Sequence, residues 1–271
     1  MRLFRVFYIK LPLFGLFILL FHQNLWAYPE RLQEEQHCSY PASAVVKLEL
    51  EGVSGNGTAF FIDSHHLLTN AHLATRTHRL TITSRCLTHL EPIEARVVNT
   101  WFDRNNIATE IEREIYGIDG EMIPTSEDWA VIEIDNPLGD QLGFFSVLGS
   151  ERYGVGDSKG RELLEEAFLC EAIAGGVKSG LNSCSLGYPR LYRPQMTHSS
   201  ADVTYHVKGM PGGSSGYTAN FRVLGGSSGS PVYYFNPNTQ VAVAFGLIQG
   251  GVFESLRGPL RFNYITEINE I

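Results

Sequence analysis

Short apolar runs, separated by polar and glycine-rich turns, fill the chain after its first forty residues. Apolar and polar positions partly alternate in residues 44–50, and a Gly55-Asn56-Gly57 turn leads from this run to the next. Alternation with a period of two, bounded by such turns, is typical of antiparallel β-strands. We therefore expect an all-β protein, with enough strands before residue 137 for one small barrel. The runs that predict strands are residues 44–50, 57–62, 67–69, 80–83, 94–98, 129–134, 185–187, 203–207, 232–235 and 241–249.

Residues 1–27 predict a secretory signal peptide. Three basic residues precede or border an apolar run from Leu11 to Phe21, and the small residue Ala27 follows at a suitable cleavage position. An uncleaved anchor is the alternative, but the run is shorter than the roughly 20 apolar residues that cross a bilayer. We expect cleavage after Ala27, a secreted or periplasmic protein, and no stable membrane insertion of the mature chain. Residues 28–43 are polar and irregular, and form an N-terminal arm or a short pro-segment in this interpretation.

Composition narrows the class of protein. The 271 residues include 27 glycines and are 44% hydrophobic and 18% charged, which suits short strands and turns better than long charged helices. The formal net charge is -8, from 21 basic and 29 acidic residues, and loss of three basic residues with the signal leaves 18 against 29, a net of -11. A groove for nucleic acid needs a basic face, so we expect no nucleic-acid partner.

Four cysteines in an exported chain predict two disulfides, for which three pairings are possible. We favour Cys170 with Cys184, because both flank a glycine-rich, turn-forming segment. Cys38 with Cys86 would then tie the N-terminal arm to a strand.

Neighbouring histidines raise the question of a metal site. His65 and His66 lie in a polar hairpin tip, and nothing nearby supplies a carboxylate at a spacing such as His-Glu-x-x-His. The chain has no Cys-x-x-Cys pair of the kind that binds zinc. We expect neither a metal nor a cofactor, and an exported metal-binding protein stays as an alternative for metal analysis to test.

Ser228 lies in the segment Gly225-Gly226-Ser227-Ser228-Gly229-Ser230-Pro231, whose glycines allow a tight turn that exposes a hydroxyl. The same turn would free the N–H groups of Gly226 and Ser228 to stabilise a tetrahedral oxyanion. A flexible glycine–serine loop is the alternative, and Gly212-Gly213-Ser214-Ser215-Gly216 repeats the first five letters. Because that copy lacks the following Ser-Pro-Val and strand, we assign the nucleophile to Ser228 rather than to Ser215.

A serine nucleophile needs a base to take its proton and an acid to orient that base. His72 ends the segment Leu68-Thr69-Asn70-Ala71-His72, where a β-rich stretch turns, and Asp128 stands before the apolar run 129–132. A buried carboxylate is costly unless it is paired, and a histidine N–H would compensate it. Glu127 is the rival acid, but only Asp128 directly abuts the strand. Alternatively, His72 is an ordinary histidine and Asp128 a surface residue that caps a strand.

These three segments together resemble those of the trypsin-like (chymotrypsin-fold) serine proteases, nearest the bacterial V8-like and glutamyl endopeptidase branch. The matching motifs are Thr69-Asn70-Ala71-His72, Asp128-Trp129-Ala130-Val131 and Gly226-Ser227-Ser228-Gly229-Ser230-Pro231. The resemblance implies two packed six-stranded antiparallel β-barrels with the active site between them. It places a protease domain at residues 44–271, with the first barrel at about 44–137 and the second at about 145–271.

The resemblance also implies where substrate binds. Gly250 and Gly251 are expected on an edge strand that pairs with the substrate backbone, next to Gln249. Val223 and Ile248 stand where glutamyl endopeptidases have a threonine and a histidine, so a pocket for glutamate is unsupported and a less polar pocket is expected. No Arg-Ile-Val-Gly-Gly activation sequence is present, which argues against activation by a new N-terminus.

The sequence therefore predicts a monomeric serine endopeptidase that acts on protein or peptide substrates through His72, Asp128 and Ser228. The first rival is a non-catalytic binding protein on the same scaffold, which would be expected to have lost a member of the triad. The second is an esterase with the same triad. An α/β-hydrolase would place Gly-x-Ser-x-Gly between a strand and a helix, whereas a strand is predicted after Ser228.

Overall fold

The computed structural model describes most of the chain after its first 29 residues. The described residues are 30–53, 55–75, 77, 79–87, 91–102, 128–147, 177–190, 195–206, 216–221, 223–236, 238–253 and 260–267. The predicted signal peptide, Cys170, Ser215 and Glu127 lie outside them.

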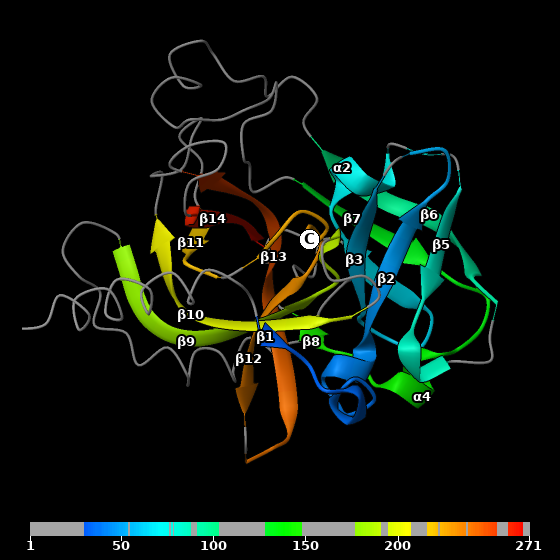
Figure 1. Cartoon of the computed structure of the whole chain (residues 1–271), viewed down its shortest axis with the longest axis horizontal. Coiled ribbons are helices and arrows are strands. Elements are labelled where there is room, and N and C mark those ends of the chain that lie inside the picture. The colour runs from blue at the N-terminus through cyan, green and yellow to red at the C-terminus, as the bar shows by residue number, and fades with distance from the viewer. Residues whose placement is uncertain are drawn as a thin grey trace, which may run out of the picture.

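Six antiparallel strands close the first barrel, in the order β2-β3-β4-β7-β6-β5 (Figure 1). This confirms the barrel predicted before residue 137. Each strand overlaps its predicted range, and in β2 and β5 the burial alternates between the two sides of the barrel wall. The strands are β2 (Val45–Leu50), β3 (Asn56–Phe61), β4 (His66–Thr69), β5 (Leu80–Thr83), β6 (Ile93–Phe102) and β7 (Asp128–Glu133).

A second sheet forms the other half of the molecule. Its pairings run β10-β11-β14-β13-β12-β9, and β9 pairs with β10 again, so six strands return to their start. Two short strands are added at its margins: β1 (Glu30–Arg31) pairs with β10, and β8 (Ser146–Val147) pairs in parallel with β13. The six strands are β9 (Val177–Gly187), β10 (Thr197–His206), β11 (Gly216–Ala219), β12 (Pro231–Asn236), β13 (Val241–Phe253) and β14 (Leu260–Glu267).

The described helices are single turns. Each of them lies in a connection between two strands. They are η1 (Glu34–Gln36), η2 (Ala42–Ala44), α2 (Ala71–Ala74), η3 (Arg85–Leu87) and α4 (Gly139–Leu142). None of the described helices has the length and apolar character needed to cross a bilayer.

A shared apolar core joins the two halves. Strand β3 is buried along both faces: Phe61 packs inside the first barrel, whereas Phe60 points to the other half. Phe145, in the connection between the halves, makes edge-on ring contacts with Phe60 at 5.2 Å and with Tyr233 of β12 at 5.3 Å between centroids. Such contacts contribute about 0.5–1.5 kcal/mol each beyond the area that they bury. The two halves are thus packed against each other from buried side chains of both.

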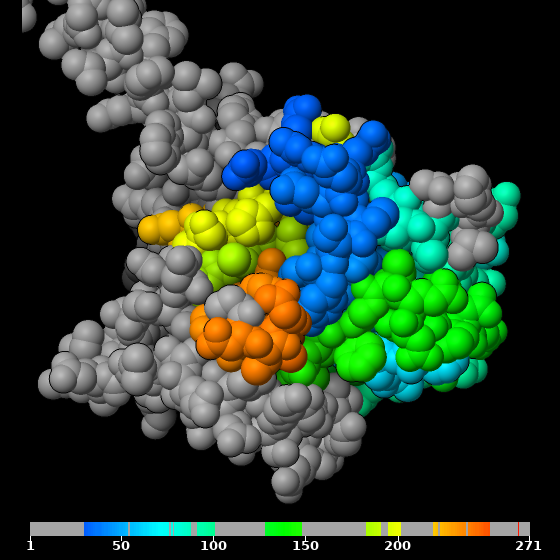
Figure 2. Space-filling view, turned by 90° about the horizontal axis from the view of Figure 1, so that it is seen from below, coloured from blue at the N-terminus to red at the C-terminus, as the bar shows by residue number. Residues whose placement is uncertain are grey.

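The N-terminal arm is a part of this packing. Beyond β1, the Leu32 N–H donates to Met196 O at 3.1 Å, and the Tyr40 hydroxyl donates to Phe144 O and accepts from the Ala242 N–H, both at 3.1 Å. In Figure 2 the blue surface of the arm and β2 lies between the yellow-green surface of the second sheet and the green surface of residues 128–147. The region that the sequence suggested as an irregular arm or pro-segment contributes a strand and fixed contacts to both halves.

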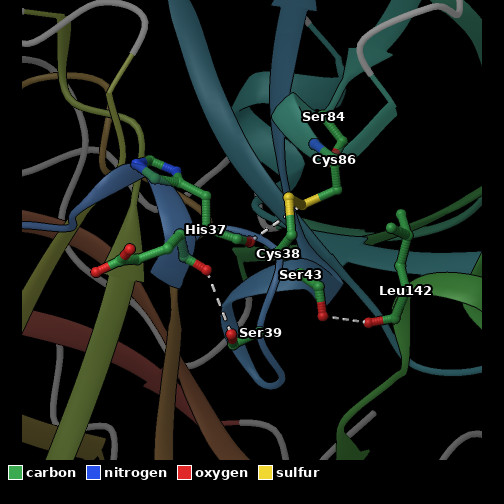
Figure 3. The surroundings of a disulfide bond; sticks show 8 residues. His37, Cys38, Ser39, Ser43, Ser84, Cys86 and Leu142 are labelled. Carbon is green, nitrogen blue, oxygen red and sulfur yellow. Dashed lines mark hydrogen bonds between the residues drawn. A yellow bond between two sulfur atoms is a disulfide. The ribbon is translucent and has the colours of Figure 1, made fainter.

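The predicted Cys38–Cys86 disulfide is present and ties this arm to the first barrel (Figure 3). Cys86 lies in η3, one turn after β5, rather than within a strand as expected. For the other predicted bond, Cys184 is a free thiol in the structure, and Cys170 lies outside the described residues. Cys184 stands opposite Tyr233 in the pairing of β9 with β12, and burial raises the pKa of its thiol despite a hydrogen bond with that tyrosine.

Candidate active site

The pairing of β4 with β7 brings His72 to Asp128. The register pairs Thr69 with Ala130, so the chain that continues from β4 into α2 passes the start of β7, where Asp128 lies. Asp128 has no exposed surface, whereas the His72 side chain is 13% exposed. The histidine therefore stands between a buried acid and the protein surface.

Both carboxylate oxygens of Asp128 bind His72. The ring atom Nδ1 lies 2.6 Å from Oδ2, and the backbone N–H of His72 donates to Oδ1 at 2.8 Å. Because an ionised carboxylate only accepts, this contact requires the proton on Nδ1 and leaves Nε2 of the neutral ring as the basic nitrogen. Asn70, which the sequence analysis did not single out, fixes the same pair, because its side-chain amide donates to Asp128 O at 2.9 Å.

The Ser228 segment is a tight turn that depends on two glycines. Gly226 and Gly229 have φ of 101° and 83°, a region that glycine adopts readily and other residues rarely. A Cβ at Gly226 would lie 2.8 Å from Tyr188 O and 2.9 Å from Arg190 N, so space as well as backbone conformation requires glycine. At Gly229 a Cβ would overlap Thr58 O. The predicted role of these glycines in shaping the turn agrees with this geometry.

Thr58 of β3 holds this turn against the first barrel. Its N–H donates to Ser228 O at 2.9 Å, and its hydroxyl donates to Gly226 O at 3.2 Å and accepts from the Tyr188 N–H at 3.0 Å. Its carbonyl accepts from the Thr69 hydroxyl at 2.7 Å, three residues before His72. A single buried residue thereby connects the serine turn with the chain that leads to the histidine.

The hydroxyl of Ser228 donates to the backbone carbonyl of Gln249 at 3.2 Å. Within the described part of the chain, no hydrogen bond joins it to His72, so the structure forms the His72–Asp128 pair and not the complete triad. The turn nevertheless lies beside the histidine's own strand through Thr58 and Thr69. Sequence reasoning could not have found this orientation, because a serine side chain has three rotamers and the motif does not choose among them.

The N–H groups of Gly226 and Ser228 are available as the predicted oxyanion donors. Gly225 O accepts from the Arg190 N–H at 2.7 Å, and Ser227 O accepts from the Ser230 N–H at 3.0 Å. In a trans peptide the N–H points opposite to the carbonyl, so the N–H groups that follow these carbonyls point away from those partners. Neither one has an acceptor among the described residues, although their function as an oxyanion hole stays a prediction.

The residues predicted to pair with the substrate backbone, Gly250 and Gly251, lie within β13. Gly250 and Gly251 pair with Tyr264 and Asn263 of β14 on one side. On the other side β12 ends its pairing at Leu247, and Ile248 exchanges hydrogen bonds with Gly229 and Ser230. After Ile248 no described strand covers this edge of β13. This edge of β13 is open among the described strands, and its pairing with a substrate backbone stays a prediction.

The predicted pocket residues differ in exposure. Ile248 is buried, and Val223 is half-buried against the same apolar cluster. Their place in the wall of a less polar substrate pocket stays a prediction. The Gln249 side-chain oxygen Oε1 is buried without a hydrogen-bond partner.

His66 Nδ1 binds Asp63 Oδ2 at 2.7 Å within the hairpin tip, and no described group of three His, Cys, Asp or Glu residues could hold a metal ion.

Comparison with known proteins gives structural matches only. No family model matches the chain, and no curated protein sequence matches it. Among solved structures, the chain is similar to the active form of the Rv3671c protease from M. tuberculosis, with 18% identity over 90% of this chain and 86% of that chain and a TM-score of 0.47. It is also similar to a Glu endopeptidase in complex with MPD, with 14% identity over 88% of this chain and 92% of that chain and a TM-score of 0.50.

Both of these structural neighbours are proteases by their descriptions, and at such identities the match to Glu endopeptidase indicates a common fold. The fold in question consists here of the closed first barrel and the second ring of six strands. The chain therefore has the trypsin-like, or chymotrypsin, fold of the serine proteases that its motifs resemble.

Proposed function

We propose that this chain is an exported serine endopeptidase that hydrolyses peptide bonds in protein or peptide substrates. The observation that carries the proposal is the position of Asp128, a fully buried carboxylate with both oxygens bound by His72. Burying a carboxylate opposes folding unless it is compensated, and this arrangement fixes the tautomer that a base requires. Export is supported by the predicted signal peptide and by the Cys38–Cys86 disulfide, since disulfides persist in oxidising compartments.

In the proposed reaction Ser228 Oγ attacks the scissile carbonyl carbon while its proton passes to His72 Nε2. The negative oxygen then accepts hydrogen bonds from the N–H groups of Gly226 and Ser228. Collapse of this intermediate breaks the C–N bond, and the leaving amine takes the proton from His72. Water hydrolyses the resulting ester by the same route, and Asp128 stays ionised throughout.

The Gln249 carbonyl has a second part in this scheme. In the structure it accepts the Ser228 hydroxyl, and it also lies at the start of the uncovered edge of β13. A peptide that extends this edge would place a backbone N–H on that carbonyl. Its N–H would compete for the acceptor, and rotation about the Cα–Cβ bond of Ser228 would then turn the hydroxyl to His72.

A fluorophosphonate probe tests the proposal, because it reacts only with an activated serine. We expect the wild-type protein to be labelled, and Ser228→Ala and His72→Ala to lose labelling. Ser215→Ala is the matched control in the similar glycine–serine segment and should still be labelled. Persistent labelling of Ser228→Ala would refute the assignment of the nucleophile.

The Ser228–Gln249 hydrogen bond also suits the rival proposal of a non-catalytic binding protein, because it leaves the hydroxyl occupied. Digestion of casein or gelatin separates the two proposals: an inert binding protein leaves these substrates whole. A panel of matched peptides and esters distinguishes an endopeptidase from an esterase, which would cleave the esters alone.

A further inference from the structure

Arg190 is held next to the proposed oxyanion site. It ends the segment Tyr188-Pro189-Arg190, which follows β9. Its backbone N–H donates to Gly225 O at 2.7 Å, and Tyr188 O accepts from the Asn56 side-chain amide at 2.7 Å. The segment is therefore fixed between the Ser228 turn and the beginning of β3.

The Arg190 side chain is exposed and extends over Gly55, just ahead of β3. A Cβ at Gly55 would overlap guanidinium atom Nη2 and lie 3.3 Å from Cζ. The absence of a side chain at Gly55 thus leaves the place that the guanidinium occupies. The positive group lies over a position on one barrel while its backbone is bonded to the nucleophile turn on the other.

The charge of Arg190 is not neutralised by the described part of the protein. Other cationic side chains have carboxylate partners: Lys47 pairs with Glu49, Arg79 with Glu51 and Glu94, Arg85 with Glu34, and Arg96 with Glu133. Arg190 forms no ion pair with any described residue. In a chain of net charge -8, an unpaired guanidinium beside the site is a candidate for binding an acidic group of a ligand.

The direction in which a peptide crosses the site follows from the elements on the two sides of Ser228. On one side is the uncovered edge of β13, reached through Gln249. On the other side the Gly225–Gly226 turn contacts Arg190 and Asn56. A substrate whose acyl part extends β13, and whose carbonyl oxygen binds the Gly226 and Ser228 N–H groups, continues away from β13. Its leaving-group part therefore passes over the beginning of β3 and Arg190.

We infer that Arg190 selects substrates with an acidic side chain, aspartate or glutamate, shortly after the scissile bond. This inference rests on the proposed endopeptidase function and adds a substrate class to it. It concerns the leaving-group side, which is separate from the pocket formed by Val223 and Ile248.

Matched peptides test this selection. A peptide that the wild-type protein cleaves is first identified by mass spectrometry, and versions are made with glutamate or glutamine at each of the first three positions after the cleaved bond. At one of these positions we expect kcat/KM to be about fivefold higher for glutamate, the upper range for a solvent-exposed ion pair. The preference should shrink as ionic strength rises, because salt screens the pair.

Arg190→Gln should bring the ratio for the two peptides close to one, and Arg190→Glu should favour a lysine peptide instead. Arg96→Gln is the matched control: it removes one positive charge from an exposed ion pair on the first barrel and should keep the wild-type ratio. Equal cleavage of all pairs by the wild-type protein, or a preference that high salt leaves unchanged, would overturn the inference while leaving the endopeptidase intact. If the wild-type protein cleaves no peptide, the inference and the proposed function fail together.

Discussion

The ring nitrogen Nδ1 of His72 lies 2.6 Å from Oδ2 of Asp128, and the backbone N–H of the same histidine binds the other carboxylate oxygen. The side chain and the main chain of one residue therefore hold a single carboxylate. This arrangement sets the orientation of the imidazole even though the serine hydroxyl points elsewhere in the resting structure.

Replacing Asp128 with Asn should slow fluorophosphonate labelling of Ser228 by about three to four orders of magnitude. The amide can turn its NH2 group toward Nδ1, which would move the ring proton to Nε2 and remove the base. Glu133→Gln is the matched control on the same strand, where Glu133 pairs with the exposed Arg96. Stopped-flow or timed labelling measures both rates, and an Asp128→Asn rate near that of the control would contradict the proposed role.

Replacing Thr58 with Val should lower the free energy of unfolding by about 1–3 kcal/mol, because Gly226 O and the Tyr188 N–H would lose their buried partner. Labelling should slow as well, since the same hydroxyl fixes the Ser228 turn. Urea unfolding and labelling rates measure the two effects. Thr58→Ser retains the hydroxyl and should restore labelling. If Val and Ser variants behave alike, packing rather than hydrogen bonding holds the turn.

Replacing Cys38 and Cys86 with Ser should destabilise the protein by about 2–5 kcal/mol, because the bond restricts the unfolded chain between positions 48 residues apart. The melting temperature of the wild-type protein should fall in reducing agent, whereas that of the double variant should not change further. A second reductant-sensitive shift in the double variant would show that Cys184 also forms a disulfide, contrary to the structure.

Mild acid should weaken the attachment of the N-terminal arm. Burial lowers the pKa of His37 in the arm, and the nearby positive charge of Arg85 lowers it further. Burial also lowers the pKa of His198, which lies opposite Glu30 in the backbone pairing of β10 with β1. His37 is buried, and in Figure 3 its ring points away from the disulfide. A charged imidazole is therefore disfavoured in the folded protein.

The folded-state pKa values of both histidines lie below the unfolded value of about 6.5. The contribution of the neutral imidazoles to the free energy of unfolding is therefore complete above that pH, and it is lost as the pH falls from there toward the folded-state pKa values. Melting temperature measured against pH should decline there, and His37→Leu with His198→Gln should decline less. Their difference from the wild-type protein at pH 8, where the imidazoles are neutral, gives the cost of the substitutions themselves. Parallel curves for variant and wild type would rule out these histidines as the cause.

The sequence predicted the strands of the first barrel well, because each is a short and largely apolar run bounded by polar or glycine-containing turns. Strands β11 and β14 were missed, since Gly216–Ala219 is short and Leu260–Glu267 mixes charged with apolar residues. The strand β1 could not be expected from Glu30 and Arg31, whose pairing depends on a partner, β10, more than 160 positions away.

The candidate site was predictable where local sequence dictates geometry. The glycines at 226 and 229 predicted a turn, and the position of Asp128 at the start of an apolar run predicted an acid at the end of a strand. The functions of Thr58 and Arg190 could not be read in the same way. Each depends on how the two barrels meet, and that contact is made by residues about 130 positions apart.

The Cys38–Cys86 bond closes the chain into a covalent ring that contains His72 but neither Asp128 nor Ser228. The exposed tip between β2 and β3, at Glu51 and Gly52, belongs to this ring. A proteolytic cut at that tip would leave the two fragments joined by the disulfide, so no part of the protein would be released. Loss of a fragment after a cut in this region would therefore require reduction of the cross-link as well.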